Sequence, residues 1–202
     1  MEKPKNMVLG LTTKRIESLT DGVFAIAMTL LVLNLNLPPV REVNLHEVLL
    51  SQLNQFGNYV LSFILLGIFW IVHHQQFHSI HRSDRKLIWI NIFILMFIAL
   101  VPFSTSLADD FSDQILAKAF FNGNLFVLGM LFVINWIYAT AGNRLVPEDL
   151  PASRINTGLR RTLILPTVSL LAMGLSFLSP GLSSITYLLI PFILSLKPFR
   201  HT

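Results

Sequence analysis

The sequence predicts an all-α, polytopic membrane protein with six transmembrane helices. Of its 202 residues, 53% are hydrophobic and only 13% carry a charge, and its mean hydropathy is +0.63. Soluble domains of this length are less apolar. The apolar residues also gather in long segments separated by short polar loops, which is the pattern of helices that cross a bilayer.

Residues 1–202 are expected to form a single six-helix transmembrane domain. The polar start of the chain precedes a first span that is closed by the pair Pro38-Pro39, because proline interrupts a helix. A polar loop follows, with a short helix expected around residues 43–53. The predicted spans lie at about 17–37, 56–72, 87–107, 119–141, 162–178 and 182–196.

The later spans are separated by polar segments of different kinds. A polar and basic turn, residues 73–86, separates the second span from the third. Acidic residues follow the third span, and a long loop of mixed charge, residues 142–161, follows the fourth. The tight turn Ser179-Pro180-Gly181 separates the last two spans.

The basic residues indicate which side of the membrane each loop faces. All Lys and Arg residues except Arg41 and Lys118 lie at the termini or in the loops 73–86 and 142–161. With six spans these segments share one side, which the positive-inside rule identifies as cytoplasmic. We therefore expect a multi-pass protein of the cell (inner) membrane with both termini in the cytoplasm. The sequence pI near 9.7 reflects these loops, and no nucleic-acid partner is expected.

Several classes of chemistry have no support in the sequence. The chain has no cysteine, which excludes disulfides and thiolate metal sites. It also lacks the G-x-S-x-G, H-E-x-x-H and P-loop motifs of common enzymes. We expect neither an enzyme nor a cofactor. The TVGYG filter of the usual potassium channels is missing as well.

The first span carries the most informative pattern. Between Gly22 and Leu33 the only polar side chain is that of Thr29. At about 100° per residue, Ile26, Leu30 and Leu33 fall on one stripe of the helix, with Thr29 at its edge. This stripe either packs on neighbouring helices or forms a pore wall with aliphatic constrictions.

Two charged residues at the start of the first span need partners. Asp21 lies opposite the aliphatic stripe and is expected to be buried, since an ionisable group at a membrane span is costly unless it is paired. Arg15 lies about 120° away around the helix, so each should reach a different neighbour. The candidate partners are His73, His74, Trp89 and Asn91. Such contacts would form either a structural clamp or a gating latch or proton relay.

A histidine cluster offers a different interpretation. His74, His78 and His81 share one helical face, and His73 and Asp84 are close in sequence. Imidazole groups bind zinc, iron or copper, so the cluster could hold a metal ion. Alternatively it is the polar end of a helix that meets water, which we favour for His78 and His81.

Residues 15–37 and 70–107 resemble the transmembrane protein 175 family of endo-lysosomal potassium channels and their bacterial relatives. The family signature R-x-x-x-F-S-D reads Arg15-Ile16-Glu17-Ser18-Leu19-Thr20-Asp21 here. The arginine and the aspartate match, Leu19 replaces the aromatic residue, and Thr20 keeps the hydroxyl. The segment Trp70–His74 and residues 87–107 resemble the second and third spans of the family.

The resemblance implies a weakly potassium-selective cation channel, assembled as a homo-tetramer in the bilayer around its first helices. It also implies constriction rings at Ile26, Leu30 and Leu33, with Thr29 as a polar ring. Potassium would be the permeant ion, and other monovalent cations could pass by the same route. It favours the pore-wall interpretation of the stripe. A small secondary transporter and a His-based membrane metalloprotein remain as alternatives.

Overall fold

The computed structural model describes residues 12–35, 45–178, 183, 186–190 and 193, and no β-strand occurs among them. The helices are α1 (Thr13–Leu30) with its 3₁₀ continuation η1 (Leu31–Asn34), α2 (Leu45–Ser51), α3 (Leu53–Ser79), α4 (Arg85–Asp110), α5 (Ile115–Thr140) with η2 (Ala141–Asn143), α6 (Ala152–Ser176) and η3 (Thr186–Leu188).

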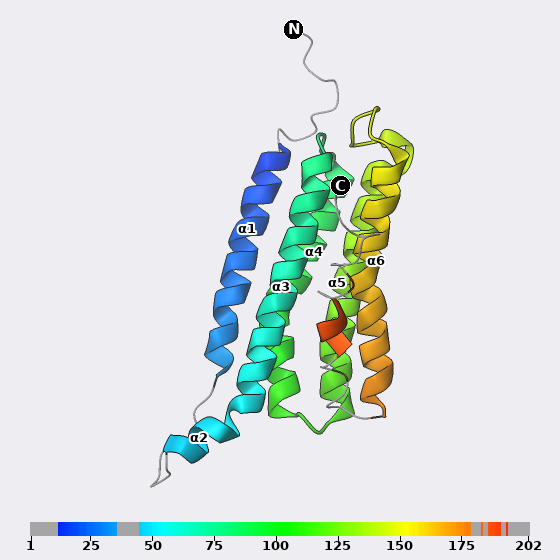
Figure 1. Ribbon diagram of the computed structural model, residues 1–202. Helices are drawn as coiled ribbons and strands as arrows, with labels where there is room; N and C mark the ends of the chain where they lie inside the picture. The colour runs from blue at the N-terminus through cyan, green and yellow to red at the C-terminus, as the bar shows by residue number, and fades with distance from the viewer. Residues whose placement is uncertain (1–11, 36–44, 179–182, 184–185, 191–192, 194–202) are drawn as a thin grey trace.

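The five long helices lie side by side as a bundle (Figure 1). Helix α1 lies at one edge and α6 at the other, and the short α2 projects sideways beyond α1. In the described part of the chain, five helices are long and apolar enough to cross a membrane. This confirms a multi-pass, all-helical membrane protein. The predicted sixth span, 182–196, falls largely outside the described residues.

Two helices, α3 and α6, extend furthest beyond the spans that the sequence predicts. Helix α3 continues to Ser79, so the first half of the segment predicted as a turn, residues 73–86, is helical. Helix α6 already begins at Ala152, inside the segment predicted as a loop, residues 142–161. In both extensions polar side chains are buried between helices, as Gln76 and Arg161 are. Tertiary contacts therefore extend these helices beyond their apolar stretches.

The core between the helices is built from large apolar side chains and from close backbone approaches. Phe69 of α3 stacks on Phe132 of α5 with the ring centroids 5.5 Å apart. A Cβ atom on Gly129 of α5 would lie only 2.7 Å from the Cδ atom of Pro166 in α6. Close approach at a small residue is the usual way in which membrane helices gain van der Waals contact.

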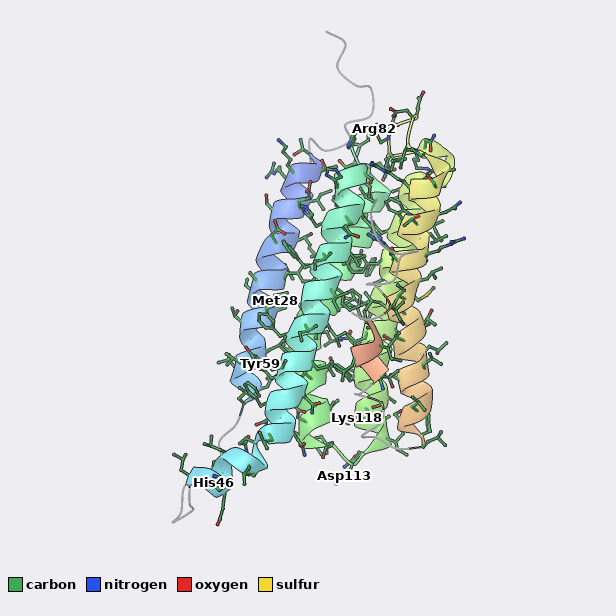
Figure 2. The ribbon with its side chains drawn as sticks, viewed as in Figure 1. Met28, His46, Tyr59, Arg82, Asp113 and Lys118 are labelled. Carbon is green, nitrogen blue, oxygen red and sulfur yellow. The ribbon has the colours of Figure 1, made fainter. Side chains whose placement is uncertain are left out.

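Most Lys and Arg residues of the described chain lie at one end of the bundle. Figure 2 shows Arg82 at the end where α1 begins, and Asp113 and Lys118 at the other end. Arg82 donates hydrogen bonds to the carbonyl oxygens of Asn143 and Val146, 3.1 and 2.9 Å away. The two basic loops, residues 73–86 and 142–161, are thus joined at one end, which we call the basic end.

Candidate functional site

Helix α1 has two distinct faces. One face packs on α3 and α4 through buried side chains at helical spacing: Ile16, Thr20, Phe24 and Ala27, followed by Leu31 of η1. The opposite face has no neighbour within the described part of the subunit.

The predicted aliphatic stripe occupies this opposite face. The exposed fractions of Ile26, Leu30 and Leu33 are 61%, 42% and 69%. Thr29 is exposed beside them, and its hydroxyl donates a hydrogen bond to the carbonyl oxygen of Ile26, 2.8 Å away. The stripe therefore does not pack on any described part of its own subunit.

Small residues share this exposed face with the aliphatic side chains. Ser18, Gly22 and Ala25 are exposed on α1, and a Cβ atom on Gly22 would meet no atom within 4 Å. The exposed side chains of α4, in contrast, include the large residues Trp89, Phe93, Met96 and Phe103. Small residues are typical of surfaces on which another membrane helix packs, whereas large apolar ones suit lipid.

A buried polar network holds the N-terminal half of α1. Asn91 of α4 donates from its side-chain amide to the Thr20 hydroxyl of α1, 3.2 Å away. The Asn91 carbonyl oxygen accepts a hydrogen bond from Nε2 of His73 in α3, 3.1 Å away. All three side chains are buried. The sequence predicted His73 and Asn91 as partners of Asp21 or Arg15, whereas here Asn91 bonds to Thr20 and to His73. The network joins three helices.

Asp21 does not lie where the sequence predicts. Its side chain is exposed, so the prediction that it is buried is wrong. Its carboxylate accepts a hydrogen bond from the indole Nε1 of Trp70 in α3, 2.8 Å away, and the His74 ring stacks on Trp70 with centroids 6.0 Å apart. An indole N–H near the end of a membrane span can donate to an exposed carboxylate. Asp21 can therefore have a partner without being buried.

The other predicted members of this group are not brought together. Trp89 is exposed and lies next to Phe93 on its own helix, with centroids 6.4 Å apart. Arg15 and Leu19 are exposed near the start of α1. In the residues that the structure describes, no hydrogen bond joins the Arg15 side chain to the predicted partners on α3 and α4.

The C-terminal end of the first helix, in η1, is also bonded to its neighbours. The Asn34 side-chain amide donates to the carbonyl oxygen of Pro102 in α4, 2.8 Å away. The Asn34 carbonyl oxygen accepts a hydrogen bond from the Gln55 side chain of α3, also at 2.8 Å. With both ends of α1 attached to α3 and α4, the rotation of the helix is fixed, and so is the direction in which its stripe faces.

Sequence reasoning missed Trp70 as the partner of Asp21 and a second polar network in the bundle. In that network, the Asn135 side chain of α5 donates to the side-chain oxygen Oε1 of Gln76, 2.8 Å away. The side-chain nitrogen of Gln76 donates to the Thr162 hydroxyl of α6, 3.2 Å away. The spacing of polar residues in α3 could have indicated both the Trp70 contact and the network around Gln76. Trp70, His73 and Gln76 recur every three residues, which places polar side chains along one side of α3.

The histidine cluster does not form a metal centre. No group of three or more His, Cys, Asp or Glu side chains in the described residues could hold a metal ion. His74, His78 and His81 are exposed, whereas His73 is buried and bonded to Asn91. The site that remains is an exposed aliphatic stripe on a helix fixed at both ends.

Comparison with known proteins points to one family. A family model described as "Endosomal/lysosomal potassium channel TMEM175" matches residues 15–102. A potassium channel of Streptomyces collinus is 35% identical over 148 residues, which are 69% of this chain and 71% of that protein. A potassium channel of Chamaesiphon minutus is 31% identical over 177 residues, covering 85% of this chain and 87% of that one. The chain matches only 23% of the length of the chicken endosomal/lysosomal proton channel TMEM175, at 36% identity.

A solved structure extends the similarity to nearly the whole chain. The crystal structure of a lysosomal potassium-selective channel TMEM175 homolog from Chamaesiphon minutus superposes with a TM-score of 0.81 at 29% sequence identity. The match covers 93% of this chain and 98% of that one. The two chains therefore share the arrangement of their helices.

Proposed function

The chain belongs to the TMEM175 family of potassium channels, and on that premise we propose that it conducts potassium through a pore walled by α1 from several copies. The family is one of ion channels, so the chain is a channel subunit and not an enzyme. The observation that carries the proposal is the exposure of Ile26, Leu30 and Leu33 on the face of α1 that the described part of its own subunit leaves uncovered.

A pore of this kind needs several subunits. Helix α1 lies at the edge of the bundle (Figure 1), so its exposed face encloses no channel by itself. Cyclic symmetry would bring the same face of each copy to a common axis. The small residues Ser18, Gly22 and Ala25 support close approach of such helices. We propose a homo-tetramer, as the resemblance to the bacterial members implies.

The aliphatic stripe would then form stacked rings along the axis. Ile26 and Leu30 lie about 6 Å apart along a helix that rises about 1.5 Å per residue. A narrow apolar ring excludes water, and an ion cannot shed its hydration shell there, so the closed state blocks flux until the ring widens and fills with water. Aliphatic groups offer no ligand to an ion, so we expect the preference for potassium to be weak.

Thr29 supplies the polar atoms nearest the rings. Its hydroxyl hydrogen is engaged with the Ile26 carbonyl oxygen, and the lone pairs of the hydroxyl oxygen stay available as acceptors. A ring of Thr29 oxygens could therefore replace part of the water around a partly dehydrated cation. The Asp21–Trp70 and Thr20–Asn91–His73 contacts act as a clamp, which makes α1 move together with α3 and α4 when the pore opens.

The basic end of the bundle is the cytoplasmic end in this proposal. The loops 73–86 and 142–161 meet there, and the positive-inside rule places such loops in the cytoplasm. The start of α1 lies at the same end (Figure 2). The protein would reside in the cell (inner) membrane, with both termini in the cytoplasm and the acidic residues around Asp113 outside.

Ion flux into proteoliposomes under a potassium gradient tests the pore wall. Ile26→Asn is expected to raise potassium conductance and to lower selectivity over sodium, because an amide wets the ring and offers oxygen ligands. Leu171→Asn is the matched control. Leu171 is 56% exposed but lies on α6, at the opposite edge of the bundle from α1.

Three outcomes separate the interpretations. Altered currents in Ile26→Asn but not in Leu171→Asn support the assignment of the pore wall. Equal currents in both variants and in the unchanged protein would refute it. Saturable, ion-coupled flux without single-channel steps would favour a small secondary transporter instead.

A further inference from the structure

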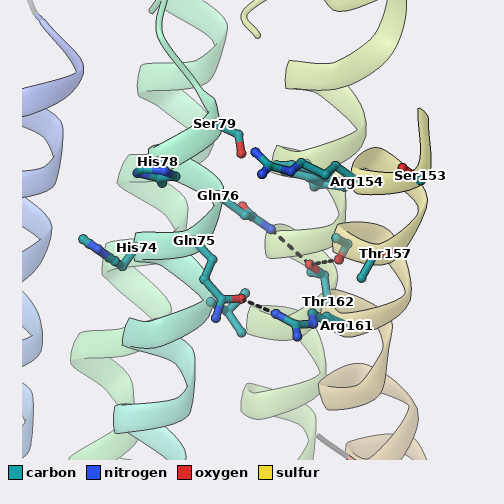
Figure 3. Close-up of a pocket in the computed structure, with 13 residues that line it drawn as sticks. His74, Gln75, Gln76, His78, Ser79, Ser153, Arg154, Thr157, Arg161 and Thr162 are labelled. Carbon is teal, nitrogen blue, oxygen red and sulfur yellow. Dashed lines mark hydrogen bonds between the residues drawn. The ribbon is translucent and has the colours of Figure 1, made fainter. Parts of the chain in front are cut away.

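A cavity of about 570 Å³ lies between α3 and α6 at the basic end of the bundle (Figure 3). Its volume falls within the range of small-molecule sites in proteins. Two arginines and several hydroxyl and amide groups line it, and no Asp or Glu is among its lining residues. The cavity is distinct from the exposed face of α1 and has no part in the proposed pore.

Arg161 lies inside this cavity, and no described residue supplies it with an anionic partner. Only 9% of its surface is exposed, and its Nη1 atom donates to the neutral side-chain oxygen of Gln75 in α3, 3.3 Å away. Its Nε atom is buried and has no hydrogen-bond acceptor. Buried arginines are ordinarily paired with a carboxylate or another anion. In the described residues, the cavity supplies the cation but not the anion.

Arg154 adds a second positive charge at the mouth of the cavity. It precedes Arg161 by seven residues, two helical turns, so both arginines lie on the same side of α6. Figure 3 shows the Arg154 side chain reaching from α6 toward Ser79 of α3. Ser153 and Thr157 also line the cavity, and Thr157 lies between the two arginines along α6. Two guanidinium groups with hydroxyl donors beside them are suited to bind an oxyanion.

We propose that this cavity binds a phosphate group, held between the guanidinium groups of Arg154 and Arg161. The planar fork of an arginine donates two parallel hydrogen bonds to phosphate oxygens, and these charge-assisted bonds are among the strongest that side chains form. The phosphate belongs either to the headgroup of a lipid in the adjacent leaflet or to a soluble phosphate ester. Both sources present the same oxyanion to the two arginines.

Calorimetric titration of the purified protein in a neutral detergent tests the proposal. The probes are glycerol 3-phosphate, dioctanoyl phosphatidic acid and, as the zwitterionic control, dioctanoyl phosphatidylcholine. At least one of the first two is expected to bind, and more tightly than the control. Arg154→Gln and Arg161→Gln are each expected to weaken that binding by about tenfold or more, the usual effect of losing a hydrogen bond to a charged group.

Arg160→Gln is the matched control variant. Arg160 precedes Arg161 on α6, is exposed and is not among the residues that line the cavity, so its removal changes the net charge equally but should leave the affinity unchanged. If Arg161→Gln fails to fold, as judged by its elution volume and unfolding temperature, the exposed Arg154 carries the comparison alone.

The outcomes also identify the source of the phosphate. Equal binding of both phosphate probes supports a soluble ligand, and binding of phosphatidic acid alone supports a lipid headgroup. Absence of binding by either phosphate probe would overturn the proposal. So would an equal loss of affinity in Arg160→Gln, since general attraction to a basic surface would then explain the data. No ion flux is measured, so this test is independent of the proposed pore.

Discussion

Replacing Gly129 in α5 by alanine measures how closely α5 and α6 approach each other. The new Cβ atom would lie 2.7 Å from Cδ and 2.9 Å from the backbone nitrogen of Pro166. Packed carbon atoms prefer separations of about 3.5–4.0 Å, so the two helices must separate locally by roughly 0.8 Å. The Pro166 ring cannot rotate out of the way, because it is closed onto its own backbone.

The expected loss follows from two opposing terms. Overpacking of this kind costs about 1–3 kcal/mol, whereas alanine gains about 0.5–1 kcal/mol over glycine within a helix. Gly129→Ala should therefore lower the free energy of unfolding by about 0–2.5 kcal/mol. The measurement is the unfolding of the detergent-solubilised protein, followed by circular dichroism.

Gly123→Ala provides the control on the same helix. A Cβ atom at Gly123 would meet no atom within 4 Å, so this variant keeps the helix-forming gain without the clash and should be slightly more stable than the unchanged protein. The difference between the two alanine variants isolates the contact between α5 and α6, and it should be about 1–3 kcal/mol. Equal unfolding free energies of the two variants would refute the close approach of these helices.

Two further substitutions test α1 and its clamp. Gly22→Ala should leave the stability of the isolated subunit unchanged or slightly higher, because the new Cβ atom meets no atom within 4 Å, but it should reduce potassium flux in proteoliposomes if copies of α1 pack on this face. Gly57→Ala on α3 is the control, since its Cβ atom also meets no atom within 4 Å, and it should leave the flux unaltered. Full flux in both variants would count against a shared α1 face. Trp70→Phe keeps an aromatic ring for His74 but removes the hydrogen bond to Asp21, and because that carboxylate is exposed we expect a loss of only about 0.5–1.5 kcal/mol. A double-mutant cycle of Trp70→Phe with Asp21→Asn should show coupling, and strict additivity of the two losses would contradict the contact.

The features predicted most reliably are those that depend on local pattern. The long apolar segments predict the membrane helices, and five of them are found in the described part of the chain. The period of the first span places Ile26, Leu30 and Leu33 on one stripe, and all three are exposed together. This works because membrane spans must satisfy their backbone groups within a helix, so the helical period applies before any tertiary contact is known.

Pairings between helices could not be predicted in the same way. Asp21 was expected to be buried, with His73, His74, Trp89 or Asn91 as its partner, but it accepts its hydrogen bond from Trp70 while Asn91 bonds to Thr20. Asn91 of α4 and Trp70 of α3 bond to neighbouring residues of α1. Which of them reaches which residue depends on the rotation of α3 and α4 relative to α1, and no property of a single helix sets that rotation.

The sequence by itself determined that this is a membrane protein, where its apolar helices run, and that its first helix carries an uninterrupted aliphatic stripe. Only the tertiary structure decided that this stripe faces away from the described helices of its own bundle and that polar contacts extend α3 and α6 beyond their apolar stretches. It also decided that Arg161 ends inside a cavity to which the described residues contribute no carboxylate. The physical reason is that hydropathy and helical period are properties of one segment. Burial and pairing are properties of two or more segments, and they depend on how the helices turn toward one another.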